Sequence, residues 1–411
     1  MSKVSVIGLG YVGLPTAVTL ASRGHQVTGC DTDPRVLAML AAGAAHFREP
    51  DLDMLLAASL ATGALAVQAT PAEAEFHIIA VPTPLNESQG AELAHVDAAA
   101  AAIAPLLRPG DTIILESTVP IGTTERLAAD IARARPDLAQ PGTAPDCLHF
   151  AHCPERVLPG RMLAEIVAND RVIGGLTPEC AQRAASLYAS FSTGAALLTD
   201  ARTAEAVKLL ENAFRDVNIA FANEAAAICD RHGIDPWRAI ALANRHPRVN
   251  VLRPGPGVGG HCIAVDPWFL VEGAPEEARL IRLAREVNDA RPRLVASRIQ
   301  AAARTLDEGT LACLGLSYKP DVDDLRGSPA AEVVTALARA GLRVLVVEPM
   351  IAALPPALAA LPNVTLVTLE TALAEARVVA ILVAHRAFQG LDAAQLEGCA
   401  VVDAVGLLAG C

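Results

Sequence analysis

The chain has 411 residues, of which 52% are hydrophobic and 19% are charged, and its formal net charge is −12. This composition excludes a disordered chain, and the length suits two or three domains that each have a core. The negative charge argues against a nucleic-acid-binding surface, because no general basic field is present to attract phosphates. An anionic ligand must therefore be held by a few local Lys and Arg side chains.

The sequence also lacks the usual signs of a membrane or secreted protein. It has no uninterrupted apolar run of about 18 residues, so we expect no membrane partner. A strand-like segment begins near Lys3, so we expect no signal peptide. The nine cysteines are an odd number without the CxxC spacing of metal sites. We therefore expect a cytoplasmic protein with reduced thiols and no bound metal.

The first motif is a glycine-rich turn between a predicted strand and a predicted helix. Residues 4–7 read as a buried strand, and Gly8-Leu-Gly10-Tyr-Val-Gly13 leads into an apolar helix pattern. These glycines would let main-chain N–H groups reach a pyrophosphate at the helix N-terminus. A second strand, residues 26–30, ends at Asp31, whose carboxylate would bind ribose hydroxyls and repel a 2′-phosphate. We therefore predict NAD binding by Gly8, Gly10, Tyr11, Val12, Gly13, Asp31 and Arg35, although Arg35 weakens the case against NADP and could instead be a solvated helix residue.

Two further predicted strands end in polar residues. Residues 76–81 run into Pro82-Thr83-Pro84, and residues 111–116 run into Ser117-Thr118-Val119-Pro120. Strands of a doubly wound sheet present their carboxyl ends to the ligand, so both threonine hydroxyls are candidates for contact with the cofactor or a reacting oxygen. Turn formation by Ser, Thr and Pro is the alternative explanation.

Residues 151–160 predict another strand end followed by a loop. In that loop Glu155 could act as a base or orient a water molecule, and Arg156 could bind a phosphate or a carboxylate. A surface ion pair is the alternative for both residues. We expect Cys153 to be a packing residue.

Residues 203–231 have the pattern of a long helix. Apolar residues recur every three or four positions, and Lys208, Asn212 and Arg215 follow at i, i+4 and i+7 on one narrow face. A solvated charged stripe is the usual explanation, but Asn is a poor helix former, so Asn212 hints at a specific contact. A helix of this length would span about 42 Å at 1.5 Å per residue. It is long enough to join two domains and to offer a homodimer surface.

The most distinctive segment is Gly255-Pro-Gly-Val-Gly-Gly-His-Cys262-Ile-Ala-Val-Asp266. Its glycines would allow another molecule close to the main chain, so the thiol of Cys262 could reach a bound substrate. A thiolate attacks a carbonyl carbon readily when a neighbouring cation favours its ionised form. An inert cysteine in a glycine-rich turn is the alternative. Just before this segment, donors such as His246 and Arg248 could hold phosphates, unless they belong only to a polar connector.

The last third repeats the α/β pattern without the glycine motif. Four strands are predicted, within residues 310–316, 342–347, 376–383 and 399–403. Ser328-Pro329 has the pattern of a helix start. Lys319 and Arg326 stand in the first crossover, where the first half has glycines, which suggests a nucleotide held by its phosphates. A domain that binds nothing is the alternative.

These segments together resemble the UDP-glucose/GDP-mannose dehydrogenase family over essentially the whole chain. The strings that carry the resemblance are Gly8-Leu-Gly-Tyr-Val-Gly13, Pro82-Thr-Pro84, Ser117-Thr-Val-Pro120, Cys153-Pro-Glu-Arg156, Glu205-Ala-Val-Lys208 with Asn212, Gly259-Gly-His-Cys262 and Tyr318-Lys-Pro320. The resemblance implies two Rossmann-like, doubly wound α/β domains joined by a long central helix and a helical middle domain. The expected divisions are an NAD-binding domain at 1–198, a central dimerisation domain with the catalytic Lys and Cys at 199–303, and a UDP-sugar-binding domain at 304–411.

The family also implies a reaction, the oxidation of a sugar C6 alcohol to a carboxylate with two NAD. Cys262 would attack the intermediate aldehyde and later carry a thioester. Lys208 would accept protons, stabilise the oxyanion and favour the thiolate. Asn212 would hold the reacting oxygen or its water. Asp266 would balance Lys208 and relay protons, and Glu155 would act in thioester hydrolysis.

Further contacts follow from the same resemblance. Thr118 completes the candidate catalytic set, and with Thr83 it would also contact the cofactor. Contacts with the sugar nucleotide are implied for Arg156, Val157, Lys208, Asn212, Arg215, His246, Arg248, Gly259, Tyr318, Lys319 and Arg326. Of these, Tyr318, Lys319 and Arg326 would bind the diphosphate side or act across a dimer.

Within the family, three strings are most similar to the UDP-N-acetyl-D-mannosamine dehydrogenase branch: residues 154–160, 169–175 and 261–269. This similarity implies UDP-N-acetyl-D-mannosamine as the substrate and a role in making surface-polysaccharide precursors. UDP-N-acetylglucosamine and UDP-glucose are alternative substrates, although His-Cys-Ile stands where the glucose branch typically has Ser-Cys-Phe. A two-electron hydroxyacid-type dehydrogenase, which needs no cysteine, and a non-catalytic nucleotide sensor are alternative classes.

Overall fold

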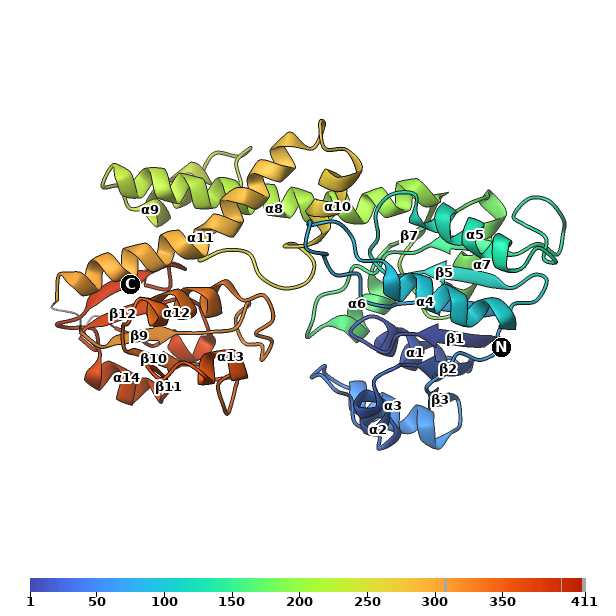
Figure 1. Ribbon diagram of the computed structural model, residues 1–411, viewed down its shortest axis with the longest axis horizontal. Helices are drawn as coiled ribbons and strands as arrows, with labels where there is room; N and C mark the ends of the chain where they lie inside the picture. The colour runs from blue at the N-terminus through green and yellow to red at the C-terminus, as the bar shows by residue number, and fades with distance from the viewer. Residues whose placement is uncertain (307–308, 393, 409–411) are drawn as a thin grey trace. The chain divides into compact units, whose positions relative to one another are not determined.

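A computed structural model describes residues 1–306, 309–392 and 394–408 of the chain. They fall into two compact units, Met1–Glu211 and Asn212–Cys411, each of which contains its own sheet (Figure 1).

The sheet of the first unit has eight strands in the order β3-β2-β1-β4-β5-β6-β7-β8, and only the β6–β7 pair is antiparallel. The strands are β1 (Lys3–Ile7), β2 (Gln26–Cys30), β3 (Leu65–Gln68), β4 (Phe76–Ile79), β5 (Thr112–Leu115), β6 (His149–His152), β7 (Arg171–Gly175) and β8 (Ala196–Asp200). Consecutive residues on a strand belong to different cores: Ile78 packs in one cluster and Ile79 in another. Alternating side chains point to opposite faces of a sheet, so both faces of this sheet are buried, as in a doubly wound fold.

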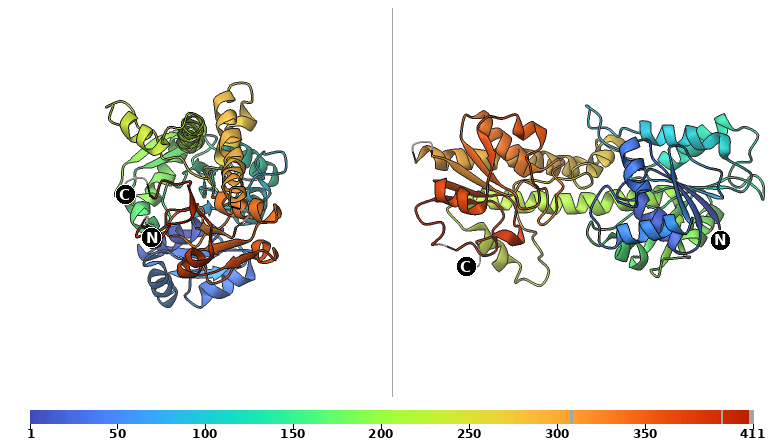
Figure 2. Two further views of the ribbon diagram at one scale, coloured as in Figure 1. Left: turned by 90° about the vertical axis from the view of Figure 1, so that its left-hand side faces the viewer. Right: turned by 90° about the horizontal axis from the view of Figure 1, so that it is seen from below.

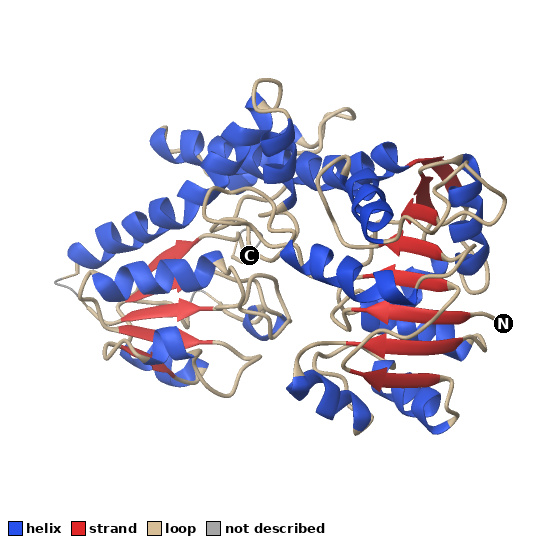
Figure 3. Ribbon diagram, turned by 45° about the vertical axis from the view of Figure 1, so that its right-hand side comes forward, coloured by secondary structure: helices blue, strands red, loops and turns tan. Residues whose placement is uncertain are grey.

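Helices connect these strands and cover the sheet (Figure 3). They are α1 (Gly13–Ser22), α2 (Pro34–Ala41), α3 (Leu52–Ala61), α4 (Ala94–Ile103), the 3₁₀ turn η1 (Ala104–Leu106), α5 (Thr123–Ala134), α6 (Met162–Ala168) and α7 (Pro178–Tyr188). Two of them start with the expected chemistry. Asp33 caps α2 and Thr177 caps α7, and in each case proline follows at the first helical position.

The long helix α8 (Ala201–Arg231) confirms the helix that the sequence predicts at 203–231. Buried Glu205 fixes its first turns to the start of α5. The carboxylate of Glu205 accepts hydrogen bonds from the N–H groups of Gly122 and Thr124 at 2.6 and 2.7 Å and from the Thr124 hydroxyl at 2.6 Å. These donors are the unpaired groups of a helix N-terminus, so Glu205 supplies the cap that α5 lacks locally.

The second unit contains the rest of α8 and three more helices before its sheet, namely α9 (Pro236–Ala243), α10 (Asp266–Gly273) and α11 (Arg279–Arg304). Helices α8 and α11 lie side by side and run in the same direction (Figure 2). Two ion pairs show this: Asp216 pairs with Arg285, and further along both helices Asp230 pairs with Arg298. The Asp216–Arg285 pair is fully buried, with atoms 2.6 Å apart. A buried ion pair tolerates few alternative registers, so it fixes how the two helices align.

The sheet of the second unit is entirely parallel, in the order β11-β10-β9-β12-β13. Its elements are β9 (Leu311–Leu314), α12 (Pro329–Arg339), β10 (Val344–Val347), α13 (Pro356–Ala359), β11 (Val364–Leu366), α14 (Leu369–Glu375), β12 (Val378–Ile381), the 3₁₀ turn η2 (Arg386–Phe388) and β13 (Ala400–Asp403). Ser328 caps α12 as the sequence predicts. The four predicted strands are present, and β11 is a fifth that the sequence analysis missed.

The predicted fold class is confirmed, since two α/β sheets are accompanied by a helical middle with long helices α8 and α11. The three-part division at residues 198 and 303 stays a prediction. Among the described residues, no helix combines the length and apolarity that crossing a membrane requires.

Candidate active site

The glycine-rich turn after β1 forms a cradle that side chains would fill. A Cβ on Gly13 would lie 1.8 Å from the Gly8 carbonyl oxygen, and a Cβ on Gly8, where φ is +91°, would lie 2.5 Å from the Ala80 oxygen. A Cβ on Gly10 would meet nothing within 4 Å. The outer two glycines therefore let the turn pack tightly, and the middle one borders open space. This arrangement fits a pyrophosphate held by main-chain N–H groups at the start of α1.

Asp31 follows β2 and orders the same turn. One carboxylate oxygen accepts from Leu9 N–H at 3.0 Å, and the other accepts from Asp33 N–H at 2.9 Å. Arg35 does not reach toward the turn but forms a two-pronged pair with Asp33, at 2.8 Å for the closest atoms. Hydrogen bonds from Arg35 lower the pKa of Asp33 to about 2. The structure thus places Asp31 against the glycine-rich turn, and its contact with NAD stays a prediction.

The neighbouring residues of the motif have distinct contacts. The Tyr11 ring stacks on Phe47, with ring centroids 4.3 Å apart, and Val12 occupies the residue before α1. At the next two strand ends, the Thr83 hydroxyl donates to the Thr118 carbonyl oxygen at 2.6 Å. The structure therefore brings together the two predicted threonines, from the ends of β4 and β5.

Glu155 lies in a buried ion pair with Arg171, so the alternative of a surface ion pair does not apply to this residue. Both terminal nitrogens of Arg171 lie 3.3 Å from one carboxylate oxygen of Glu155, and the other oxygen accepts from Arg156 N–H at 2.7 Å. The Arg171 guanidinium also faces the rings of Tyr188 and Phe191, at 4.7 and 5.2 Å from their centroids. Because both oxygens have donors, the carboxylate is held in one orientation.

A second buried carboxylate, Glu116, lies beside this pair and was missed by the sequence analysis. It follows β5 and accepts hydrogen bonds from the hydroxyls of Tyr188 at 2.6 Å and Thr16 at 3.2 Å. Burial, reinforced by the nearby charge of Glu155, raises the pKa of Glu116 to about 7. Its position directly before Ser117 and Thr118, at a strand end, was the available signal. Arg171 and Tyr188 gave none, because they come from β7 and α7.

Arg156 is engaged by protein groups rather than left open. Its guanidinium donates to Glu211 at 2.7 Å and to the carbonyl oxygen of Asp170, and its own carbonyl accepts from Asn169 at 3.2 Å. Val157 is half-buried against the core of the first unit. A role for Arg156 in substrate binding would therefore require it to share or exchange these partners.

Lys208 and Asn212 lie one turn apart on α8. The Lys208 side chain is half-buried, and its charge reaches His152 at the end of β6. Burial chiefly, with this charge in addition, lowers the pKa of His152 to about 3. Arg215 is exposed on the following turn of the helix. Lys208 thus lies near the carboxyl edge of the first sheet, which is where a doubly wound fold binds ligands.

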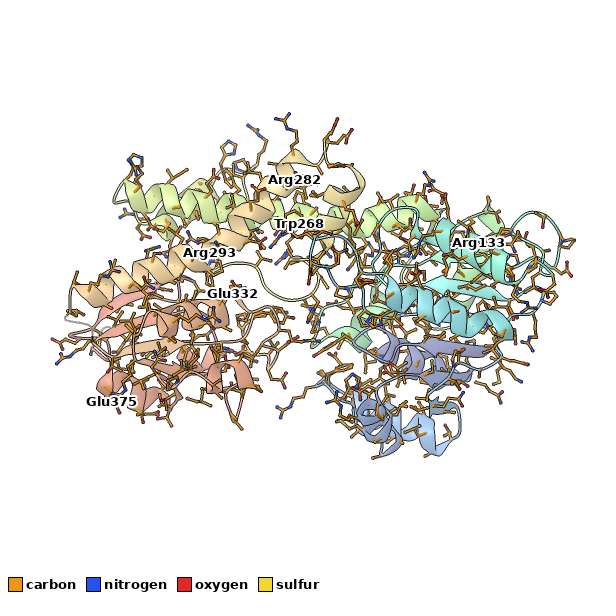
Figure 4. The ribbon with its side chains drawn as sticks, in the orientation of Figure 1. Arg133, Trp268, Arg282, Arg293, Glu332 and Glu375 are labelled. Carbon is orange, nitrogen blue, oxygen red and sulfur yellow. The ribbon has the colours of Figure 1, made fainter. Side chains whose placement is uncertain are left out.

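In the second unit, the cysteine loop is tied to α8. The Asn212 side-chain amide donates to buried Asp266 at 2.5 Å, and Asp266 N–H donates to the Cys262 carbonyl at 2.8 Å. Asp266 starts α10, whose Trp268 is buried (Figure 4). Of the cysteines that the structure describes, Cys262 is the exposed one. The structure therefore brings Asn212, Asp266 and the Cys262 loop together.

The same loop packs against the crossover that follows β9. A Cβ on Gly259 would lie 2.7 Å from the Gly327 oxygen, and a Cβ on Gly260 would lie 3.1 Å from the Tyr318 ring. Arg326 pairs with Asp324 at 2.7 Å, and the Lys319 carbonyl accepts a hydrogen bond from the Ser317 hydroxyl at 2.8 Å.

The remaining predicted ligands are on the surface. His246 and Arg248 are exposed in the turn after α9, where Arg248 N–H donates to the His246 ring at 3.3 Å. Within the described residues, no cluster of three His, Cys, Asp or Glu side chains could hold a metal ion. The roles of all these residues in catalysis or binding stay predictions.

Comparison with known proteins gives the family. The NAD-binding domain of the UDP-glucose/GDP-mannose dehydrogenase family matches residues 2–192, its central domain matches 202–290, and its UDP-binding domain matches 312–409. A relative from Ralstonia nicotianae named NDP-N-acetyl-D-galactosaminuronic acid dehydrogenase is 52% identical and covers 98% of this chain and 96% of its own.

Two further relatives carry another name. The UDP-N-acetyl-D-mannosamine dehydrogenase of Escherichia coli K12 is 48% identical, with 99% of both chains covered. The solved structure of the UDP-D-ManNAc dehydrogenase from Pyrococcus horikoshii is 36% identical, with a TM-score of 0.88 over 98% of this chain and 96% of that one. With the glycine cradle and the cysteine loop in place, the chain belongs to the UDP-glucose/GDP-mannose dehydrogenase family and is an NAD-dependent nucleotide-sugar dehydrogenase.

Proposed function

We propose that this protein oxidises the C6 alcohol of UDP-N-acetyl-D-mannosamine to the uronic acid through a covalent intermediate on Cys262. The observation that carries the proposal is the hydrogen bond between Asn212 and Asp266, which links the α8 face predicted to be catalytic to the loop of an exposed thiol. A two-electron dehydrogenase would need no such thiol. The product would serve as a precursor for a surface polysaccharide.

The chemistry balances as one alcohol, two NAD⁺ and one water giving one carboxylate, two NADH and three protons. Bound NAD⁺ supplies the acceptor for each of the two hydrides that leave C6. After the first hydride leaves, the Cys262 thiolate adds to the aldehyde carbon and forms a thiohemiacetal. Loss of the second hydride turns that carbon into a thioester, and water then breaks the C–S bond and regenerates the thiol.

The side chains of this chain would manage protons and charge in those steps. Lys208 would take the alcohol proton and stabilise the oxyanion of the hemiacetal. Asn212, which Asp266 holds by a 2.5 Å hydrogen bond, would orient the reacting oxygen or the hydrolytic water. Asp266 would offset the charge of Lys208. Glu155, fixed by Arg171, would orient water for thioester hydrolysis, and Thr118 would contact the reacting oxygen.

The sugar nucleotide would be held by cations from separate segments. We propose that the diphosphate side is bound by Lys319, Arg326 and Tyr318. The other proposed contacts are Arg156, Val157, Arg215, His246, Arg248 and Gly259. Arg326 and Arg156 would release Asp324 and Glu211, respectively, to do so. NAD would be held by Gly8, Gly10, Tyr11, Val12, Gly13, Asp31, Arg35 and Thr83.

A second substrate has support from a specific observation. The 52% identical relative from Ralstonia nicotianae is named for N-acetyl-D-galactosaminuronic acid, so UDP-N-acetylgalactosamine is the competing substrate. The two sugars share the N-acetyl group and differ in ring stereochemistry, which the shape of the pocket must discriminate.

The test is a panel of UDP-sugars scored by NADH formed per substrate consumed. We expect UDP-N-acetyl-D-mannosamine to give the highest kcat/KM and two NADH per sugar. We expect Cys262→Ser to lose the full oxidation of the sugar to the uronic acid. Faster use of UDP-N-acetylgalactosamine, UDP-N-acetylglucosamine or UDP-glucose would refute the sugar. One NADH per sugar, with activity kept in Cys262→Ser, would refute the covalent mechanism.

A further inference from the structure

The cysteine loop is held by hydrogen bonds at its first glycine, seven residues before Cys262. Gly255 N–H donates to the side-chain oxygen of Asn223 on α8 at 2.9 Å. The Gly255 carbonyl accepts from Nε of Arg291 on α11 at 3.0 Å. Arg291 also donates to the Asn223 carbonyl at 3.3 Å. The long helices α8 and α11 therefore bind the N–H and the carbonyl group of Gly255, respectively.

The orientation of the Asn223 amide is fixed by a chain of buried partners. Asp216 can only accept when ionised, so Asn288 must point its NH₂ group at Asp216, at 2.8 Å. The Asn288 oxygen then accepts from the Asn223 NH₂ group at 2.9 Å, which leaves the Asn223 oxygen for Gly255. Arg285 donates to Asp216 at 2.6 Å and anchors the chain. Each step allows one amide orientation, so the acceptor presented to Gly255 cannot flip freely.

Burying so many polar and charged side chains costs free energy that the packing of two helices does not require. Asn223 and Asn288 are each 1% exposed, Arg291 is 4% exposed and Asp216 is fully buried. Burial disfavours the charged form of the Arg291 guanidinium and so lowers its pKa. Apolar side chains would pack two helices at least as well as a buried polar network does. A fully bonded network instead fixes one arrangement, and here its far end is the main chain of the loop.

The other side of the loop is fixed by close packing. At Gly257, where φ is +146°, a Cβ would lie 2.9 Å from Pro329 and 3.2 Å from Pro292. Gly259 has similarly little room against Gly327 and Pro329. The loop is therefore bounded by steric contact downstream of Gly255 and by hydrogen bonds at Gly255 itself. Its path is defined at both places, and Cys262 follows directly.

We propose that Asn223, Asn288 and Arg291 are positioning residues that set the path of the cysteine loop so that the Cys262 thiol is presented for addition to the aldehyde. The inference rests on the proposed covalent role of Cys262. The positioning role concerns only the steps that follow the first hydride transfer. Removal of the first hydride from C6 needs no thiol, whereas the second hydride leaves only after the C–S bond has formed. Loss of the hydrogen bonds to Gly255 should therefore slow formation of the second NADH and leave the rate of the first unchanged.

The experiment is single-turnover NADH formation with Asn223→Ala, Asn288→Ala and Arg291→Met in the full-length protein, using the UDP-sugar that the panel selects. We expect the second phase to slow by about tenfold to a hundredfold, because small misplacements of a reacting group cost that much. We expect the rate of the first phase of NADH formation to stay within about twofold of the wild-type rate. Arg291→Lys keeps one donor for Gly255 and should recover part of the loss.

The matched control is Arg298→Ala, which breaks the 2.6 Å ion pair with Asp230 between the same two helices and removes none of the hydrogen bonds that join Gly255, Asn223 and Arg291. It should leave both phases unchanged. Hydrogen exchange of the peptide containing Gly255 should rise in Asn223→Ala and not in the control. Equal slowing of both phases, the same effect in Arg298→Ala, or no effect in any variant would overturn the positioning role.

Failure of the proposed function would look different. If wild-type protein makes one NADH and Cys262→Ser keeps it, the covalent role fails whatever the network variants do. If wild-type protein makes two NADH and Cys262→Ser does not, but Arg291→Met and Asn223→Ala match wild type in both phases, the covalent role stands and the positioning role fails.

Discussion

At the scale of single residues, two buried glutamates beside the first sheet differ in their hydrogen-bond partners. Glu155 is matched by Arg171, whereas Glu116 has hydroxyl donors from Tyr188 and Thr16. A hydroxyl donor compensates burial of a negative charge less than a guanidinium does. Glu116 therefore holds its proton at a pH where an exposed glutamate has lost it.

This difference predicts a pH-dependent stability that Glu116→Gln removes. The pKa of Glu116 is about 7 in the folded protein, against an ordinary value of 4.5. Between these values the folded state binds a proton that the unfolded state has released, so raising the pH favours unfolding. The cost is about 1.4 kcal/mol per pH unit across that window. Glutamine cannot titrate, so urea unfolding of Glu116→Gln should lose less stability than wild type between pH 5 and pH 7.

The comparison needs a carboxylate that is not buried. Glu87 is exposed in the same unit, and Glu87→Gln should follow the wild-type pH dependence. Parallel stability curves for wild type and Glu116→Gln would contradict the assignment of a raised pKa to this residue.

What the sequence reveals at this scale depends on spacing along the chain. The glycine cradle was predictable because Gly8, Gly10, Gly13 and the strand ending before Asp31 follow each other closely. The partners of Glu116 and Glu155 were not, because Tyr188 lies 72 residues from Glu116 and Arg171 lies 16 residues from Glu155, on other elements. Such pairs can be recognised only once the order of the strands in the sheet is known.

At the scale of elements, α8 is the part of the fold that the sequence predicts best. The helix has 31 residues with a sustained apolar repeat, and its ends were predicted within two residues. Short strands are harder: β11 has three residues, and β3, with four, is largely half-buried or exposed. Neither pattern differs enough from a loop for periodicity to detect it.

The attachment of α8 to α5 gives an element-scale prediction. Glu205→Ala would leave the N–H groups of Gly122 and Thr124 and the Thr124 hydroxyl without their acceptor at the start of α5. The two bonds from Thr124 are buried, and each buried donor left unpaired costs about 1–3 kcal/mol, so we expect a loss of roughly 2 kcal/mol or more. Chemical unfolding measures it.

A second link between the same helices provides the control. Glu125 on α5 pairs with Arg202 on α8 at 2.6 Å, but both side chains are largely exposed. Exposed pairs contribute about 0–1 kcal/mol, so Glu125→Ala should change stability little. Equal losses from the two variants would show that burial of the Glu205 cap is not what joins the helices.

At the scale of the whole molecule, the sequence predicts two α/β parts and a helical middle, and the structure has two α/β sheets with the long helices α8 and α11. The same pattern also predicts an assembly. The long helix was predicted to offer a homodimer surface, and part of its apolar repeat is exposed among the described residues. Phe214, Phe221 and Ile228 lie seven residues apart and are 72%, 61% and 54% exposed. Large exposed apolar groups in register along a helix are typical of a helix-pairing surface.

We therefore propose a homodimer that pairs through this face of α8. Sedimentation or light scattering should give a mass near twice the 42.6 kDa of one chain. Phe214→Glu combined with Phe221→Glu should convert it to monomer, because a symmetric interface places each substitution twice in the same contact. Met54→Glu, at a residue 63% exposed on α3, is the matched control and should leave the mass unchanged. A monomeric wild type would exclude the homodimer, and a dimer that survives the double substitution would exclude this face of α8 as its interface.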